Sequence, residues 1–153
     1  MQFGGSYIVS APREAVWQAL NDTEVLKAVI PGCKRIEWTG ETTLELEIQV
    51  NLGVMQPVFT GDLELGNIVP AQSYTLTGRG RGGLLGKAEA AADITLTDAG
   101  PSTRLEFTAN GGADGGIMKL GKSLIGNSAQ KIIDGFFTRF GDAMGVEVKP
   151  VAG

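Results

Sequence analysis

The sequence predicts an α+β fold in which a curved antiparallel sheet of about seven strands wraps around one long C-terminal helix. Residues 43–52 alternate between aliphatic and polar side chains, which is typical of a strand with one face in water. From Asp114 to Met144 the apolar residues instead recur every three or four positions, as on one face of a helix. With 153 residues and 42% hydrophobic content, the chain is expected to form one domain spanning residues 1–153.

The N-terminal part predicts one strand followed by two short helices. Residues 2–9 place Phe3, Tyr7 and Val9 on one face of a strand. Pro12 suits the first turn of a helix, and the Asn-Asp pair at 21–22 can end that helix and cap a second one. A Pro-Gly pair at residues 31–32 is expected to end the second helix.

The remaining residues up to the long helix read almost entirely as strands joined by turns. After residues 43–52, a turn at Gly53 leads to alternation around residues 59–65, and residues 67–71 turn the chain back. Three further strands follow, around residues 74–82, 86–96 and 105–111, and the last two meet in a hairpin whose loop holds Pro101, where a missing N–H donor is tolerated. Consecutive strands of this kind pair as antiparallel neighbours.

Small side chains gather at one end of this sheet, on the face predicted to point inward. Antiparallel pairing brings them together beside the start of the long helix. They are Gly78, Gly80, Ala88, Ala90 and Ala109 on three strands, and Gly121 on the helix is expected to meet them. Two interpretations stay open: a cavity for an apolar ligand, of roughly 300 Å³ or more, or close packing of the helix backbone on a glycine-rich hairpin.

The stretch GRGRGGLLGKAEA at residues 78–90 resembles two nucleotide-binding motifs only superficially. Its glycines at 78, 80 and 83 fit a dinucleotide fingerprint, but the following residues return to strand alternation instead of starting a helix. Arg81 occupies the place of the first glycine of a phosphate loop, and Ala88 replaces its hydroxyl residue. The formal net charge of −4 also argues against binding to nucleic acid.

The composition excludes several kinds of catalytic site. The chain has no histidine, so histidine-based triads and histidine metal sites are excluded. Its lone cysteine, Cys33, has no second thiol for a disulfide and is expected to be an inert structural residue. No leader peptide and no apolar run of membrane-spanning length is seen, which predicts a soluble cytoplasmic protein.

Three basic residues on neighbouring strands are predicted to point outward. Arg79 and Arg81 alternate with the glycines, and Lys87 follows on the next strand. They are either solvated surface residues or part of a docking face for an acidic protein or a membrane surface.

The order and spacing of several segments resemble the family of the carbon monoxide dehydrogenase G subunit, within the START-like superfamily that includes the major birch pollen allergen fold. The resemblance extends from Gln2 to about Phe140. The segments are APREAVWQALND, IPGCKRIE, the GRGRGGLLGKAEA hairpin, KLGKSLIG and GFFTRF.

This resemblance implies a helix-grip fold with a hydrophobic tunnel between the sheet and the C-terminal helix. It implies a non-enzymatic accessory role for a molybdenum hydroxylase of the carbon monoxide dehydrogenase type, recruitment of that enzyme to the inner face of the cell membrane, and binding of a quinone or lipid without a covalently bound cofactor. The expected ligand-binding residues are the small inward ones together with Phe59, Tyr74, Leu76, Phe107, Met118 and Ile125. The alternatives are a START-like enzyme of the polyketide cyclase type and a purely structural assembly factor.

Overall fold

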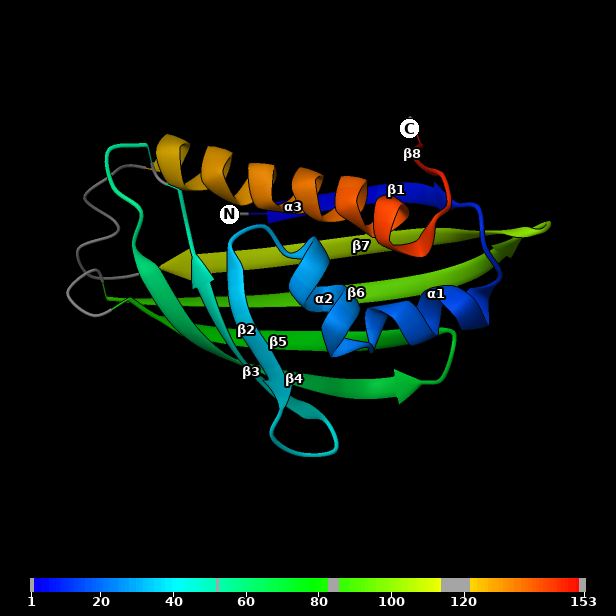
Figure 1. The fold of residues 1–153 in the computed structure, drawn as a ribbon, viewed down its shortest axis with the longest axis horizontal. Helices are drawn as coiled ribbons and strands as arrows, with labels where there is room; N and C mark the ends of the chain where they lie inside the picture. Colours follow the sequence, from blue (N-terminus) through cyan, green and yellow to red (C-terminus); the bar gives the residue numbers. More distant parts are fainter. Residues whose placement is uncertain (1, 52, 83–85, 114–121, 152–153) are drawn as a thin grey trace.

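A computed structural model describes residues 2–51, 53–82, 86–113 and 122–151, with the backbone alone for residues 113 and 122–125. Within these residues, eight antiparallel strands form one sheet in the order β2-β3-β4-β5-β6-β7-β1-β8 (Figure 1). The strands are β1 (Gln2–Val9), β2 (Cys33–Trp38), β3 (Thr43–Gln49), β4 (Val58–Val69), β5 (Ser73–Arg81), β6 (Lys87–Ala99), β7 (Ser102–Ala113) and β8 (Val148–Pro150).

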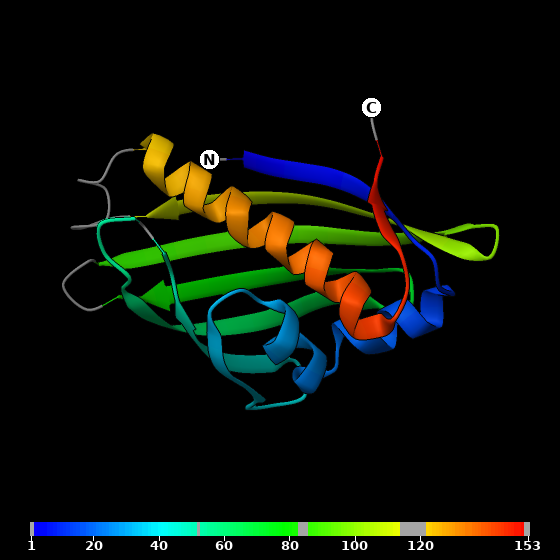
Figure 2. The same ribbon diagram turned by 45° about the horizontal axis from the view of Figure 1, so that its top comes forward.

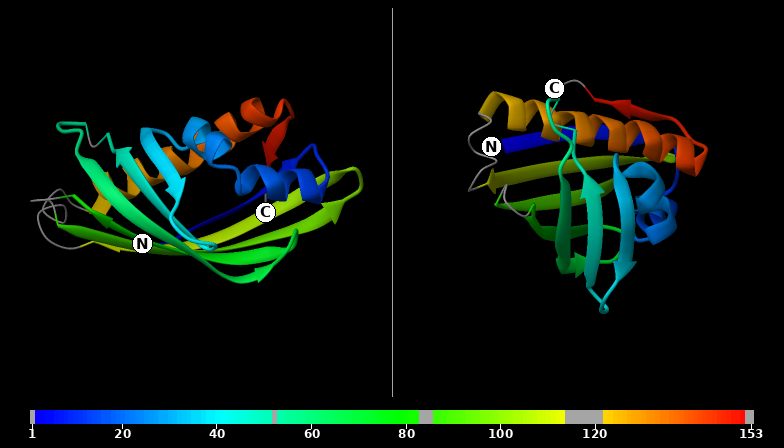
Figure 3. Two further views of the ribbon diagram at one scale, coloured as in Figure 1. Left: turned by 60° about the horizontal axis from the view of Figure 1, so that its bottom comes forward. Right: turned by 60° about the vertical axis from the view of Figure 1, so that its left-hand side comes forward.

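The helices lie on the concave side of the sheet. They are α1 (Arg13–Leu20), α2 (Thr23–Val29) and α3 (Lys122–Met144). Figure 2 shows α3 crossing the sheet diagonally, and Figure 3 shows the sheet curving beneath all three helices. This is the predicted α+β helix-grip architecture, with two short helices after the first strand.

Local sequence signals end several of the elements, although β4 continues to Val69, into the turn predicted for residues 67–71. The Asp22 carboxylate accepts a hydrogen bond of 2.9 Å from the backbone N–H of Glu24, which caps α2. Ala71, at φ of +58°, lies in the turn between β4 and β5, whereas Asn67, at +49°, lies within β4 where the pairing register with β5 shifts. Pro101 lies in the turn between β6 and β7, where no strand partner needs its missing donor.

The structure differs from the prediction at a strand boundary and adds one strand. The strand predicted for residues 43–52 ends at Gln49. The short strand β8 was missed because three residues carry too little alternation to be recognised. It pairs with β1 after the chain turns at Gly145, whose φ is +68°. Residues 114–121 of the predicted long helix lie outside the described residues.

The core joins the C-terminal half of α3 to the sheet and to the two short helices. Phe140 is fully buried and Phe137 is 8% exposed, with Phe136 packed beside them. A Cβ atom on Gly135 would lie 2.8 Å from Cγ of Pro31, so α3 passes directly over the turn that follows α2. The backbone of α3 and the turn after α2 are therefore closely packed at Gly135.

Candidate ligand-binding cavity

An apolar cavity of about 240 Å³ lies between the sheet and α3. Strands β5, β6 and β7 form its floor, α3 forms its roof, and the ends of α1 and α2 close one side. Its walls are Leu20, Ile30, Tyr74, Leu76, Ala92, Ile94, Leu105, Phe107, Ala109, Ile132, Ile133, Phe136 and Phe137. The volume is smaller than the roughly 300 Å³ expected from the sequence, and suits a ring system or part of a longer chain.

Tyr74 is the only residue among these described walls whose side chain carries a polar atom. The side chain is 8% exposed, and its ring meets Trp17 edge-on at a centroid distance of 5.3 Å. Among the described residues its hydroxyl has no hydrogen-bond partner. Burial raises the pKa of Tyr74 to about 12, so the phenol remains a neutral donor at physiological pH. A buried donor without a partner favours a ligand that brings an acceptor.

An aromatic cluster stiffens the wall next to α3. Phe137 stacks on Tyr7 at a centroid distance of 3.9 Å and on Phe107 at 5.5 Å. Phe136 meets Phe137 edge-on at 5.2 Å. Because these rings hold one another from β1, β7 and α3, the shape of the cavity is set largely before a ligand arrives.

Four of the residues predicted to bind a ligand lie on the cavity wall. They are Tyr74 and Leu76 on β5, and Phe107 and Ala109 on β7. The wall residues of α3, Ile132, Ile133, Phe136 and Phe137, were not among the predicted ligand-binding residues, and their position opposite Ala92 and Ala109 is visible only in the fold. Met118 and Gly121 lie outside the described residues, as does the side chain of Ile125.

The glycine-rich end of the sheet is filled by side chains of β4 and does not border the cavity. A Cβ atom on Gly78 would lie 3.0 Å from Cδ2 of Leu63, and one on Gly80 would lie 3.9 Å from the ring of Phe59. Phe59 itself is 6% exposed. Of the two interpretations of these glycines, the geometry favours close packing, although strand β4 supplies the contact. Ala88 and Ala90 also lie away from the cavity walls.

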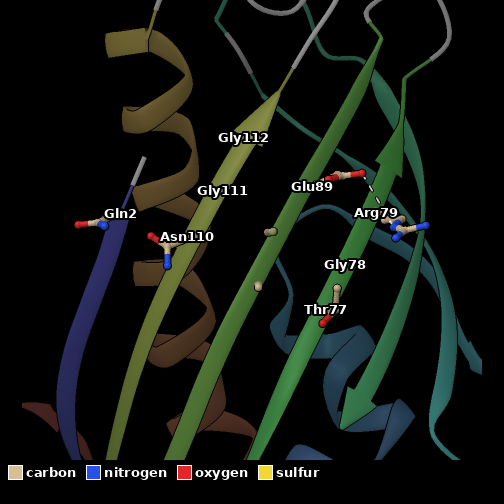
Figure 4. Close-up of a pocket in the computed structure, with 10 residues that line it drawn as sticks. Gln2, Thr77, Gly78, Arg79, Glu89, Asn110, Gly111 and Gly112 are labelled. Carbon is tan, nitrogen blue, oxygen red and sulfur yellow. Dashed lines mark ion pairs between the residues drawn. The ribbon is translucent and has the colours of Figure 1, made fainter.

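A shallow hollow of about 420 Å³ lies over strands β1, β5, β6 and β7, where Figure 4 shows the side chains that border it. Gln2, Thr77 and Asn110 make much of its border, together with the ion pair that joins Arg79 Nε to Glu89 Oε1 at 3.9 Å. Both charged side chains of this pair are about three-quarters exposed, so the pair contributes little to stability. The polar border and open shape make this hollow a poorer ligand site than the apolar cavity.

The three predicted docking residues lie together on the outer side of β5 and β6. Arg81 pairs with Lys87 across the two strands, and the Arg81 guanidinium lies 3.5 Å from the carboxylate of Asp62. Neighbouring carboxylates therefore offset part of the positive charge of both arginines.

Cys33 and the acidic residues are candidate reactive or metal-binding groups in the described part of the chain. The Cys33 thiol donates to the carbonyl oxygen of Arg35 at 3.4 Å, and burial raises its pKa, which lowers its reactivity. Among the residues described, no three His, Cys, Asp or Glu side chains come together as a metal site would require. No described helix is both long and apolar enough to cross a membrane.

Comparisons with known proteins place this fold in one family. The family model of the carbon monoxide dehydrogenase G subunit (CoxG) matches residues 5–145. No curated protein matches the chain. Among solved structures, a conserved protein from Geobacillus kaustophilus has a TM-score of 0.87 at 26% identity, over 97% of this chain and 99% of that chain.

More distant structures share the fold alone. The Zhui aromatase/cyclase from Streptomyces sp. R1128 has a TM-score of 0.68 at 14% identity, over 94% of this chain and 93% of that chain. Ara h 8.0201 has a TM-score of 0.65 at 13% identity, over 95% and 98%. With its START-like helix-grip fold and a match over residues 5–145, the chain belongs to the CoxG family, that of the carbon monoxide dehydrogenase G subunit.

Proposed function

We propose that this protein is a non-enzymatic accessory protein of a molybdenum hydroxylase of the carbon monoxide dehydrogenase type, and that it binds a quinone or lipid in its cavity and helps to recruit the enzyme to the membrane. The observation that carries the proposal is the cavity between the sheet and α3, whose wall side chains are apolar apart from Tyr74. Burial of apolar ligand surface is favourable by about 25 cal/mol per Å². Membership of an accessory-subunit family supports the same role.

The composition of the cavity favours a carrier over an enzyme of the aromatase/cyclase kind. General acid–base catalysis works best when the pKa of the catalytic group lies near the working pH. The one polar side chain on the described wall is a phenol whose pKa burial raises to about 12. Such a group donates a hydrogen bond well but transfers its proton poorly at neutral pH.

Tyr74→Phe is expected to weaken binding of decylubiquinone about tenfold, because a hydrogen bond from a neutral donor contributes roughly 1 to 1.5 kcal/mol. Quenching of the Trp17 fluorescence measures binding, since that ring touches Tyr74. Tyr7→Phe is the matched control, because Tyr7 loses the same hydroxyl but does not line the cavity. If the wild type binds no decylubiquinone, the quinone-carrier function is wrong. If Tyr74→Phe and Tyr7→Phe bind it with equal affinity, the Tyr74 hydroxyl does not contribute to binding.

Exposed apolar side chains and basic residues lie together at the end of the molecule where β4 begins, and this supports membrane recruitment. Val54 and Met55, on the loop between β3 and β4, are 88% and 39% exposed. Thr60 near the start of β4 pairs with Arg81, which pairs with Lys87, so the basic residues lie at the same end. Exposed apolar side chains next to cations suit an anionic bilayer surface.

Reversing both arginines with Arg79→Glu and Arg81→Glu is expected to weaken binding to phosphatidylglycerol vesicles and to the partner enzyme. The loss should be large at low salt and shrink at high salt, because exposed charges are screened beyond about 8 Å at physiological ionic strength. Co-flotation with vesicles and pull-down of the enzyme measure the two contacts. A variant carrying Arg139→Glu and Lys149→Glu changes net charge equally and should bind normally. Unchanged binding of the Arg79/Arg81 variant at low salt would show that these arginines are only solvated.

A further inference from the structure

A second hollow, of about 600 Å³, lies between the turn after α2, the loop that joins β3 to β4, and α3. Its lining differs from that of the apolar cavity. The polar side chains in it are Gln49, Asn51, Gln56, Asn127, Ser128 and Lys131. No sequence pattern predicts this hollow, because its residues come from three segments far apart in the chain.

The polar hollow adjoins the apolar cavity. Ile132 of α3 lines both spaces. At the end of α2, Ile30 lines the cavity and the next residue, Pro31, lines the hollow. A single molecule of moderate length can therefore have an apolar part in the cavity and a polar part in the hollow.

The hollow offers hydrogen-bond donors that the described part of the protein does not use. Asn127 and Lys131 lie one turn apart on α3, both exposed, and neither side chain has a hydrogen-bond or ion-pair partner among the described residues. The Gln49 amide donates only a long bond, 3.3 Å, to the carbonyl oxygen of Gln56. Lys131 is the only charged side chain among the described lining residues, on a chain whose net charge is −4. The hollow is therefore locally suited to oxygen acceptors.

The floor of the hollow is fixed by the backbone. The N–H of Gln49 donates to the carbonyl oxygen of Gly32 at 2.9 Å, which ties the turn after α2 to the edge of β3. On the other side, α3 packs on Pro31 at Gly135. Donors on α3 and on β3 are thus held at a set separation, which lowers the entropic cost of binding a head group.

We propose that this polar hollow is a head-group site for an amphiphile, whose apolar body occupies the cavity and whose head presents oxygen acceptors to Asn127, Lys131 and Gln49. The proposal rests on the carrier function proposed above and adds the place where the polar head of the quinone or lipid is bound. It also sets the orientation of the ligand: the head lies at the mouth and the rest of the molecule in the cavity, where a second acceptor, such as the other carbonyl of a quinone ring, would accept a hydrogen bond from Tyr74.

The test compares three probes that differ in their heads: decylubiquinone with neutral carbonyls, laurate with a carboxylate, and n-decylbenzene with no acceptor. Each is titrated by calorimetry into the wild type and into a variant carrying Asn127→Leu and Lys131→Met. Both changed residues are exposed on a helix, so the variant should fold, and its melting temperature checks this. A variant carrying Gln130→Leu and Arg139→Met, on α3 but outside the hollow, is the matched control.

The double variant should lose about tenfold in affinity for decylubiquinone, laurate or both, with n-decylbenzene unchanged and the control variant like the wild type. A loss confined to laurate identifies an anionic head, and a loss shared by both probes identifies oxygen acceptors of either charge. Unchanged affinity for both acceptor probes in the folded variant would overturn the head-group site while leaving the carrier function intact. Failure of the wild type to bind any probe would instead overturn the carrier function, and the head-group site with it.

Discussion

Ala109→Leu is expected to abolish uptake of decylubiquinone and to leave the free energy of unfolding nearly unchanged. Ala109 lies on β7 and lines the cavity of about 240 Å³ opposite the side chains of α3. A leucine there would occupy space that the ligand needs, and its added carbons would enter free volume. If the space were already filled by neighbouring side chains, the same change would overpack the core and cost roughly 1 to 3 kcal/mol.

The matched control for this change is Ala91→Leu. Ala91 lies on β6, opposite Asn110 of β7 in the strand register, and is exposed on the other face of the sheet. Both substitutions add the same atoms to a strand, but only one adds them to the cavity. Tryptophan quenching and urea denaturation measure affinity and stability for the two variants. A stability loss in Ala109→Leu without any effect on the ligand would mean that the space is not a binding site.

Gly32→Ala is expected to cost more stability than alanine at any other described glycine with a positive φ, at about 3 kcal/mol or more. The φ angle of Gly32 is +78°, a conformation that favours glycine. A Cβ atom there would also overlap the backbone carbonyl oxygen of Gln49, which cannot move without breaking the contact between β3 and the turn after α2.

Gly145→Ala separates the cost of a positive φ from the cost of the steric overlap with Gln49. Gly145 has a similar φ of +68°, but nothing described lies within 4 Å of the position that a Cβ atom would take. It should therefore show only the conformational cost, roughly 1 to 2 kcal/mol. Free energies of unfolding from urea titrations measure both variants. If Gly32→Ala and Gly145→Ala lower the free energy of unfolding equally, the turn after α2 can move to accommodate a Cβ atom. That turn would then not fix the mouth of the polar hollow.

Most of the fold could be predicted from the sequence because its signals are local. The alternation of residues 43–52 follows from one face of β3 being wet, and the capping side chain of Asp22 acts on a neighbour two residues away. The strand β8 could not be predicted, because its three residues become a strand only through pairing with β1. Pairing over such a distance in sequence leaves no local pattern.

The sequence located the inward face of the sheet but not how the space on that face is filled. Alternation identified the inward face of β5, β6 and β7, which includes Tyr74, Phe107 and Ala109 of the actual wall. It could not tell that Phe59 and Leu63 of β4 reach over the glycines of β5 and fill the space there. How far a neighbouring side chain extends depends on the curvature of the sheet, and a one-dimensional pattern does not contain that information.

The most direct test of the proposed carrier function is native mass spectrometry of the wild type and of Ala109→Leu, each incubated with a small excess of decylubiquinone. We expect the wild type to carry one molecule of decylubiquinone per chain and Ala109→Leu, equally folded, to carry none. A wild type found only at its bare mass, or an Ala109→Leu variant that retains the same adduct, would contradict the claim that the cavity between the sheet and α3 holds the ligand.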